Sequence, residues 1–262
     1  MILAIVEKIG DTVSRSFFSI YEAIKFAVIC LTHMLLPSSY NPAMRMVLTR
    51  QVYFTAVQII PFFTFLAFLF GTVIIGFVVS LAFKYSLQDQ IGSIIIHFTL
   101  DEFAPFFTAL LISLRSSTAV NTEIAVMKVN HELKTLEHFN IDLIDYLFIP
   151  RIVAGMLSVT SLSLIFAMVM LTSGYIFSYF YLSMDLHAYI KMLINAISIQ
   201  DLNVLLFKSL AFGFVIMLIP IYSGLKTMQN YSAIPISVLN GMVKLFIAIF
   251  AIEVISLLLQ SL

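Results

Sequence analysis

Long uncharged runs are the dominant pattern of hydrophobic and polar positions along the chain. Residues 52–83 carry no charged side chain and lie between Arg50 and Lys84, and residues 152–184 repeat this pattern. A helix needs about 20 consecutive apolar residues to cross the hydrocarbon core of a bilayer, and both runs are longer than that. The pattern therefore predicts an integral membrane protein.

Apolar runs of this kind recur along the chain and predict an all-α fold with five transmembrane helices. We expect the spans at about residues 52–83, 91–114, 152–182, 203–225 and 236–260, with polar turns between them. In the first span, Pro61, Gly71 and Gly76 are expected points of kinking or close helix packing. No internal repeat is evident, so residues 37–262 are interpreted as one transmembrane domain.

The N-terminal segment, residues 1–36, has a different pattern. Its apolar residues recur every three or four positions, while Glu7, Lys8, Asp11 and Arg15 interrupt any continuous apolar run. This pattern predicts an amphipathic elbow helix that lies in the membrane interface. A helix packed on a soluble core is the alternative, but the rest of the chain offers no evident soluble core.

The longest polar stretch, residues 115–151, also has the pattern of a helix, with almost no Gly or Pro. We expect one cytoplasmic helix over about residues 116–136. Its mixed charges are compatible with a simple solvated face. Most connections between elements are only about 4–6 residues long, so the length of this one favours a docking surface for a soluble partner.

Composition agrees with a membrane protein and narrows its chemistry. Hydrophobic residues make up 61% of the chain and charged residues 11%, well below the roughly 25% of soluble domains. The net charge of zero gives no indication of nucleic-acid binding. Cys30 is the single cysteine, which excludes an intrachain disulfide and a cysteine-based metal site.

The distribution of basic residues predicts the orientation, because cytoplasmic loops are enriched in Lys and Arg. With five spans, a cytoplasmic N-terminus places residues 115–151 inside the cell and the C-terminus outside. The outer loops then contain only Lys84 and Lys191. The inner segments contain Lys8, Arg15, Lys25, Arg45, Arg50, Arg115, Lys128, Lys134, Arg151 and Lys226.

Motifs for catalysis or nucleotide binding are not evident. The chain has no Gly-x-x-x-x-Gly-Lys-Ser/Thr loop, and its five histidines are scattered. His131-Glu132 begins like a zinc-protease motif, but Thr135 stands where the second His is required. We therefore expect no catalytic residue, no metal and no cofactor in this chain. Energy for any transport must come from a partner chain or an ion gradient.

Ionisable residues inside the expected spans are the best internal indication of a functional site, because each costs roughly 3 kcal/mol or more at a bilayer centre. They either pair with one another or line a polar site. Lys244 lies near the start of its span and is expected to reach the interface, and Asp101 is expected to face water. The full set is Asp101, Glu102, Lys208, Lys244 and Glu253.

Residues 50–53 and 101–154 carry four short patterns of one known family. The family patterns are Arg-Glu-Leu-Gly-Pro, Gly-Arg-x-Gly-Ser-Ala, Ala-Glu-x-Gly-x-Met and Pro-Arg, after an Arg-Gln-x-Tyr opening. The chain resembles the MlaE family, the permease subunits of Mla-type phospholipid ABC transporters, as a divergent member. The matching residues are Arg50, Gln51, Tyr53, Glu102, Pro105, Arg115, Ala119, Glu123, Met127, Pro150 and Arg151.

Departures from the patterns are equally specific. Asp101 replaces the family Arg, and Glu253 stands where members often have Asp, while Lys208-Ser209 matches the lysine of the fourth span. Glycines of the patterns are replaced by Ala104, Leu114, Ser117 and Ala125.

The resemblance implies a set of partners. Such permeases are homodimers whose coupling helix docks in a groove of a cytoplasmic ABC ATPase, and that ATPase binds the ATP and Mg²⁺. A periplasmic MCE-domain protein that binds lipid is a further implied partner, as is a small STAS-domain subunit. The coupling role would fall to Arg115, Glu123, Met127, Lys128 and Glu132.

The resemblance also implies an apolar cavity for phospholipid between the two subunits. The Phe-rich first span offers large apolar side chains for such a cavity, although packing or contact with lipid accounts for most of them. By spacing, Phe70, Phe77 and Leu81 are expected to share one face. Glu102, Lys208 and Glu253 would supply the polar features of the cavity or hold the helices together.

Together these observations predict a permease subunit in a bacterial inner membrane that moves phospholipid between the inner and outer membranes. Two other functions remain open at this point. One is an ion-coupled secondary transporter with Glu102, Lys208 and Glu253 as a relay, although no inverted repeat is evident. The other is a membrane scaffold that recruits a cytoplasmic protein through residues 115–150 without transporting anything.

Overall fold

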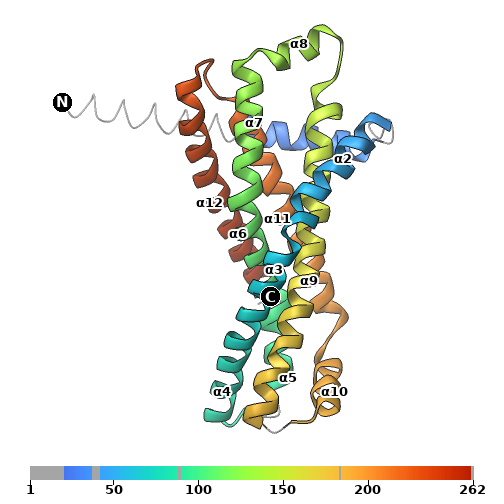
Figure 1. Ribbon diagram of the computed structural model, residues 1–262, viewed down its shortest axis with the longest axis vertical. Coiled ribbons are helices and arrows are strands. Elements are labelled where there is room, and N and C mark those ends of the chain that lie inside the picture. The colour runs from blue at the N-terminus through green and yellow to red at the C-terminus, as the bar shows by residue number, and fades with distance from the viewer. Residues whose placement is uncertain (1–20, 37–41, 88–89, 183, 261–262) are drawn as a thin grey trace, which may run out of the picture.

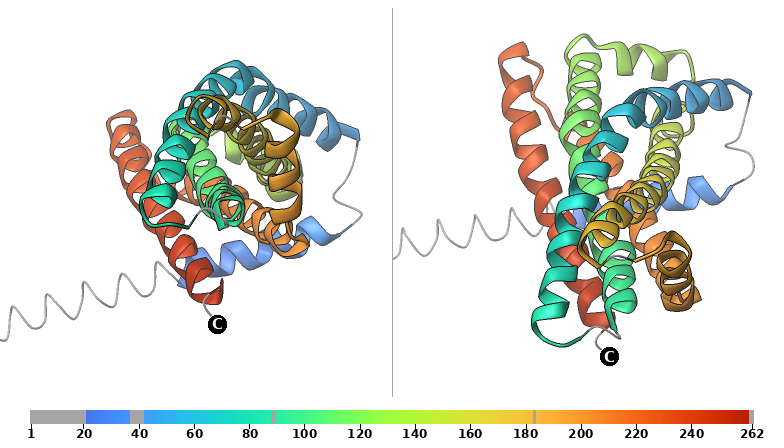
Figure 2. Two further views of the ribbon diagram at one scale, coloured as in Figure 1. Left: turned by 90° about the horizontal axis from the view of Figure 1, so that it is seen from below. Right: turned by 60° about the horizontal axis from the view of Figure 1, so that its bottom comes forward.

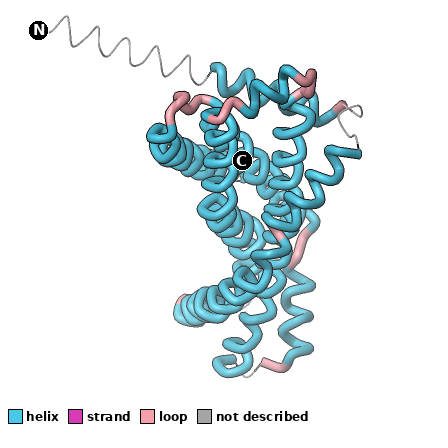
Figure 3. Tube along the Cα trace, turned by 45° about the horizontal axis from the view of Figure 1, so that its top comes forward, coloured by secondary structure: helices cyan, strands magenta, loops and turns pink. Residues whose placement is uncertain are grey.

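A computed structural model describes residues 21–36, 42–87, 90–182 and 184–260, and over these residues it contains helices and no strand (Figures 1 and 3). Residues 21–35 are helical. The helices that follow are α2 (Pro42–Thr55), α3 (Ile60–Phe70), α4 (Gly76–Lys84), α5 (Ile91–Ile96), α6 (Ala104–Ile112), α7 (Thr118–Val129), α8 (Glu132–His138), α9 (Ile149–Leu182), α10 (Leu186–Ala196), α11 (Ile199–Leu225) and α12 (Ile234–Gln260).

Five helical stretches among the described residues are long and apolar enough to cross a membrane, which confirms the predicted all-α fold with five spans. Several consist of more than one labelled helix, because short π-helical or 3₁₀ segments join the α-helices without a loop. The five stretches are Met44–Lys84, Ile91–Val129, Ile144–Phe180, Ile199–Leu225 and Tyr231–Gln260.

The first stretch changes direction between α2 and α3, as Figure 2 shows. A 3₁₀ turn, Val57–Ile59, joins the two helices, and Pro61 lies in the first turn of α3. Proline has no backbone N–H and its ring clashes with the carbonyl group four residues earlier, so a regular helix cannot run through this point. The predicted kink at Pro61 is therefore present.

Glycines allow helices to approach closely at the centre of the bundle. Helices α9 and α11 form this centre, and α3, α6, α7 and α12 pack around them. A Cβ atom on Gly213 of α11 would lie 2.5 Å from the Cα atom of Met156 in α9, so only glycine fits there. A Cβ atom on Gly71 would lie 2.0 Å from the Ser173 hydroxyl oxygen, in agreement with the close packing predicted for that glycine.

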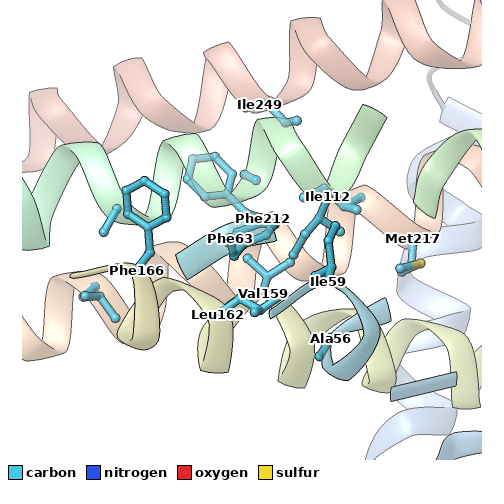
Figure 4. Close-up of a cluster of buried hydrophobic side chains, with 14 of the residues drawn as sticks. Ala56, Ile59, Phe63, Ile112, Val159, Leu162, Phe166, Phe212, Met217 and Ile249 are labelled. Carbon is cyan, nitrogen blue, oxygen red and sulfur yellow. The ribbon is translucent and has the colours of Figure 1, made fainter. Parts of the chain in front are cut away.

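A cluster of large buried side chains fills the space between these helices (Figure 4). Phe63 of α3, Phe166 of α9 and Phe212 of α11 are fully buried, and the rings of Phe63 and Phe166 meet edge to face with centroids 6.2 Å apart. Ile112 of α6 and Ile249 of α12 close the cluster. The apolar residues of five helices thus share one core.

The helix expected over residues 116–136 is two helices in the structure. The second span continues unbroken through α7 to Val129, because Val120 and Ile124 are buried against neighbouring helices and one arginine at 115 does not end a helix. The chain then turns at His131, which has a left-handed backbone with φ of 62°. After this turn, the short helix α8 runs across the end of the bundle (Figure 1).

The helix of residues 21–35 crosses the bundle near the same end, as Figures 1 and 2 show. The Phe26 ring packs against Phe148 and Tyr222, and Glu22 pairs with Lys226 just after α11. Residues 1–20 of the expected elbow helix lie outside the described residues. A location in the membrane interface stays a prediction.

Candidate functional site

Three of the ionisable residues predicted inside the spans meet around one ammonium group, which we call the Lys208 centre (Glu102, Lys208 and Glu253). The Lys208 Nζ atom lies 2.6 Å from Glu102 Oε2 and 3.0 Å from Glu253 Oε1. It also donates a hydrogen bond of 2.8 Å to the backbone carbonyl oxygen of Asp101. The centre thus joins the second, fourth and fifth spans.

The Lys208 centre is buried and has an excess of negative charge. Lys208 is 4% exposed, and the second oxygens of Glu102 and Glu253 are buried without a hydrogen-bond partner in the described chain. Two carboxyl groups thus share one ammonium group, and their side chains are 25% and 14% exposed. Because charges inside an apolar bundle are costly unless they are paired, removal of the lysine would leave both carboxyl groups without their cation.

A cavity of about 360 Å³ opens beside the Lys208 centre, between α11 and α12. Phe207, Ile255 and Leu259 give it an apolar wall, while Asn203 and Lys208 supply polar groups. This combination suits a molecule with an apolar body and a polar head.

A second polar group adjoins the first through Asp101, the residue just before Glu102, and we call it the His97 cluster (His97, Asp101 and Asp201). The His97 Nδ1 atom lies 3.1 Å from Asp101 Oδ2 and 3.0 Å from Asp201 Oδ1. The Nδ1 and carboxylate atoms of these three residues all lie within 4.8 Å of one another. They are the kinds of atoms that bind metal ions.

The position of Asp101 corrects the sequence analysis, in which we expected it to face water. Asp101 is only 6% exposed, because α11 begins beside it and covers its side chain. Lys244, in contrast, is exposed on α12, about three turns from the start of that helix, and its reach to the interface stays a prediction.

Two residues of the His97 cluster were missed by sequence reasoning, although both leave a signal in the sequence. His97 stands four residues before Asp101, a spacing that places both on one helix face. Ser198 and Asp201 have the spacing of a helix-capping pair, and they form a capping box at the start of α11. Neither signal shows by itself that the two spans meet there.

At the opposite end of the molecule, α7 is tied to α9 by the Arg151 pair (Glu123 and Arg151). The Arg151 Nη2 atom lies 2.6 Å from Glu123 Oε1. The guanidinium group is buried, whereas the Glu123 side chain is 55% exposed. Glu123 therefore lies where water reaches it, while its partner is anchored in the bundle.

The other residues predicted to couple this region to a partner lie on α7 or directly before or after it. Arg115 donates a hydrogen bond of 2.9 Å to Gln58, and Lys128 donates one to the carbonyl oxygen of Leu225 in α11. Met127 packs partly buried against the core. Glu132 is exposed and accepts a hydrogen bond of 3.0 Å from Asn130.

Arg115 also borders a small polar pocket between α2 and α7, with a volume of about 300 Å³. Gln51, Gln58 and Glu123 contribute further polar groups to its wall. Four of the coupling and motif residues named from the sequence, Gln51, Arg115, Ala119 and Glu123, therefore meet at one pocket.

Two π-helical segments of the second span contain the polar residues of these sites. His97, Asp101 and Glu102 lie in the segment His97–Phe103, and Arg115 lies in Ser113–Ser117. A π-helical turn inserts an extra residue into a helix and changes the direction of its side chains, which is why such turns are frequent at functional sites.

The three residues expected to share one face of a lipid cavity have different surroundings. Phe70 is partly buried, and its ring centroid lies 4.5 Å from that of Phe107 in α6. Phe77 is 63% exposed, and Leu81 is partly buried. The π-helical segment Gly71–Ile75 separates Phe70 from the other two and shifts the helical register between them.

Comparison with known proteins gives a consistent result. The family model described as permease MlaE matches residues 48–259. A probable ABC transporter permease protein of Rickettsia typhi is 25% identical over 224 residues, which cover 86% of this chain and 85% of that protein. A probable ABC transporter permease protein of Synechocystis is 30% identical over 166 residues, 63% of each chain. The MlaE permease protein of an intermembrane phospholipid transport system in Haemophilus influenzae is 26% identical over 160 residues, 61% of this chain and 60% of that protein.

Proposed function

Because this chain belongs to the MlaE permease family, we propose that it is the membrane-spanning subunit of an ABC transporter that moves phospholipid between the inner and outer membranes of a bacterial cell. The family match over residues 48–259 is the observation that carries the proposal, since it includes all five apolar stretches almost completely. In this role the chain transmits motion and binds lipid, and a separate ATPase subunit hydrolyses ATP.

Phospholipid as the substrate is supported from two directions. The Haemophilus influenzae relative is a permease of an intermembrane phospholipid transport system. In this chain, the cavity beside the Lys208 centre combines apolar walls with polar side chains such as Asn203 and Gln200. Apolar walls accommodate acyl chains, and polar side chains offer hydrogen bonds to a headgroup.

The second span offers a physical route from the ATPase to the lipid. It is helical without a loop from Ile91 to Val129, so Glu102 and Val129 lie about 40 Å apart on one continuous element. An ATPase that moves the α7–α8 end would also move the Lys208 centre. ATP binding then changes the relative populations of two arrangements of the spans.

The α7–α8 end is the proposed docking surface for the ATPase. Lys134 and Glu137 are exposed on α8, and Lys128, Lys226 and Lys25 lie at the same end of the bundle. The opposite end has Lys84 and Lys191. This asymmetry supports a cytoplasmic α7–α8 end, with the N-terminus inside the cell and the C-terminus in the periplasm.

Further proposed partners complete the assembly. A second copy of the chain would form the lipid cavity together with the first. An MCE-domain protein would receive or deliver lipid on the periplasmic side, and a STAS-domain subunit would bind on the cytoplasmic side. ATP and Mg²⁺ would be held by the ATPase.

Cysteine labelling in intact cells tests the orientation. Cys30 is buried, and burial raises the pKa of its thiol to about 12, so the native chain gives a low background with a maleimide. We expect Glu137→Cys to be protected from a membrane-impermeant maleimide and Lys84→Cys to react. The reverse pattern would contradict the proposed ATPase docking surface.

Reconstitution in liposomes tests the transport function. Transport of a fluorescent phospholipid should require ATP and co-purified ATPase, and Glu123→Arg should lower both ATPase recovery and transport at least tenfold. Asp185→Arg, an exposed change at the opposite end, is the matched control and should leave both unchanged. Transport by the isolated chain under a proton gradient would instead favour the secondary transporter.

A further inference from the structure

We propose that His97, Asp101 and Asp201 form a binding site for a divalent transition-metal cation, with Zn²⁺ as the expected type. The three residues come from two spans, since His97 and Asp101 belong to the second and Asp201 to the first turn of the fourth. A bound cation would link these spans beside the Lys208 centre. Neither the family match nor the proposed lipid transport assigns this site.

The balance of charge is the first reason. Asp101, Glu102, Asp201 and Glu253 bring four carboxylates into two adjoining clusters, and the salt bridges of the described residues give them a single ammonium group, Lys208. That ammonium group contacts the carboxylates of Glu102 and Glu253, and only the backbone of Asp101. The two aspartates are therefore left with the His97 ring as their ionisable partner.

The state of the Asp101 carboxylate is the second reason. Its side chain is 9% exposed, and its Oδ1 atom is buried without a hydrogen-bond partner among the residues that the structure describes. Its other oxygen, Oδ2, faces His97. A buried carboxylate with so few partners is costly, and a cation bound through either of its oxygens would offset its negative charge.

The arrangement of the donor atoms is the third reason. Zn²⁺ binds imidazole nitrogen and carboxylate oxygen at about 2.0–2.2 Å, which places neighbouring ligands of a tetrahedral site about 3.3 Å apart. The distances of 3.1 Å and 3.0 Å from His97 Nδ1 to the two carboxylates need to open by only a few tenths of an ångström. Three protein ligands leave a fourth position for water or another ligand.

Access and ligand support are also present. The His97 side chain is 57% exposed, so a cation can reach the site from outside the bundle. The second oxygen of Asp201, Oδ2, accepts a hydrogen bond of 2.8 Å from the Ser198 backbone N–H, which fixes the direction of this carboxylate. Such second contacts orient metal ligands and are typical of metal sites.

The alternative is a hydrogen-bonded cluster in which the His97 Nδ1–H is shared between the two carboxylates. The same distances allow it. The two arrangements differ in whether the protein binds a metal ion saturably. A cation site predicts saturable binding, and a shared proton predicts none.

Equilibrium dialysis of the purified full-length protein with Zn²⁺ alone tests the proposal, without lipid or ATPase. We expect one saturable Zn²⁺ per chain and at least tenfold weaker binding in both His97→Ala and Asp101→Asn. His187→Ala removes another exposed histidine from the start of α10 and should bind as the native protein does. Asp201→Asn is less suitable, because it also disrupts the cap of α11.

Three outcomes would overturn the proposal: no saturable binding by the native protein, equal binding by Asp101→Asn, or displacement of Zn²⁺ by Mg²⁺ at a similar concentration. The last would mean that the imidazole does not take part, because Mg²⁺ prefers oxygen ligands. A thermal unfolding scan of each variant checks that it is folded. Since no transport is measured, failure here leaves the proposed function untouched.

Discussion

The Lys208 centre and the Arg151 pair use opposite solutions to the problem of a charge in an apolar bundle. In the first, a buried cation holds two carboxylates from different spans, and the excess charge is negative. In the second, a buried cation holds one carboxylate that is half exposed to solvent. The comparison indicates that the Lys208 ammonium group is held by its protein partners alone. The Glu123 carboxylate, in contrast, can exchange its contact with Arg151 for water.

This difference corresponds to the two proposed functions of these regions, which are lipid binding beside the Lys208 centre and ATPase docking near the Arg151 pair. A site beside a lipid cavity gains from polar side chains that hold one another in fixed positions. A site that receives motion from another protein gains from a contact that can be remade. The second span connects both, through Glu102 near one end and Glu123 near the other.

Removal of the central cation should have the largest effect. We expect Lys208→Met to lower the free energy of unfolding by about 3–5 kcal/mol, because it leaves the partly buried carboxyl groups of Glu102 and Glu253 without a counter-charge. Denaturant unfolding in detergent measures this. Lys244→Met, an exposed lysine on α12, is the control and should stay within about 0.5 kcal/mol of the native protein.

A rescue variant sharpens the same result. If unpaired charge is the cause, neutralisation of both carboxylates in Lys208→Met/Glu102→Gln/Glu253→Gln should recover most of the loss. A triple variant as unstable as Lys208→Met would show that the packing of the lysine stem matters more than its charge.

The two members of the Arg151 pair should differ in their effect on stability. Glu123→Ala leaves a buried guanidinium group whose Nε and Nη1 atoms already have no hydrogen-bond partner in the described chain, and we expect a loss of about 2 kcal/mol. Arg151→Met leaves only a carboxylate that water can solvate, so its loss should be smaller, below about 1 kcal/mol. Unfolding of both single variants and the double variant measures the difference. Equal losses would contradict the asymmetry.

Flexibility introduced between the two regions should affect coupling more than stability. Ala119→Gly weakens α7 by about 1 kcal/mol, because glycine is a poor helix former. We expect the lipid transported per ATP hydrolysed to fall severalfold. Ala188→Gly makes the same change at an exposed position of α10, which is not part of the second span, and should leave this ratio unchanged. An equal fall in both variants would argue against a rigid link.

The sequence predicts the spans well because each depends on local composition. Residues 152–182 contain enough apolar side chains to cross a membrane, so this span can be predicted without knowing which helices pack against it. The contacts of Lys208 could be anticipated only as pairing with some other buried charge, since which carboxylates meet it depends on how three spans pack. Asp101 was misjudged for the same reason, because its burial depends on the start of α11, about a hundred residues later in the chain.

The division of residues 116–136 into two helices shows a different limit. The charges there are compatible with a surface helix, but burial of Val120 and Ile124 extends the second span, and the turn depends on a left-handed residue, His131. A non-glycine residue in that conformation leaves little signal in a single sequence. The π-helical segment between Phe70 and Phe77 is likewise not evident from spacing.

The smallest expected effect concerns the exposed pair of Glu22 and Lys226, which has neither the burial of Lys208 nor the anchoring of Arg151. The hydrogen bond from Lys226 lowers the pKa of Glu22 below its usual value of 4.5, and the same contact raises the pKa of Lys226. Any stabilisation by Glu22 is therefore present at neutral pH and lost as the pH falls through its lowered pKa.

The contribution of Lys226 has the opposite sign and is lost as the pH rises through its raised pKa. Thermal midpoints of the native protein and Glu22→Gln, measured from acidic to alkaline pH, should differ slightly at neutral pH and converge at both extremes. High salt should reduce the difference, because the pair is exposed to solvent. If the difference instead persisted at low pH, the contact between the helix of residues 21–35 and the end of α11 would have to rest on packing of Phe26 with Tyr222 and Phe148 rather than on charge.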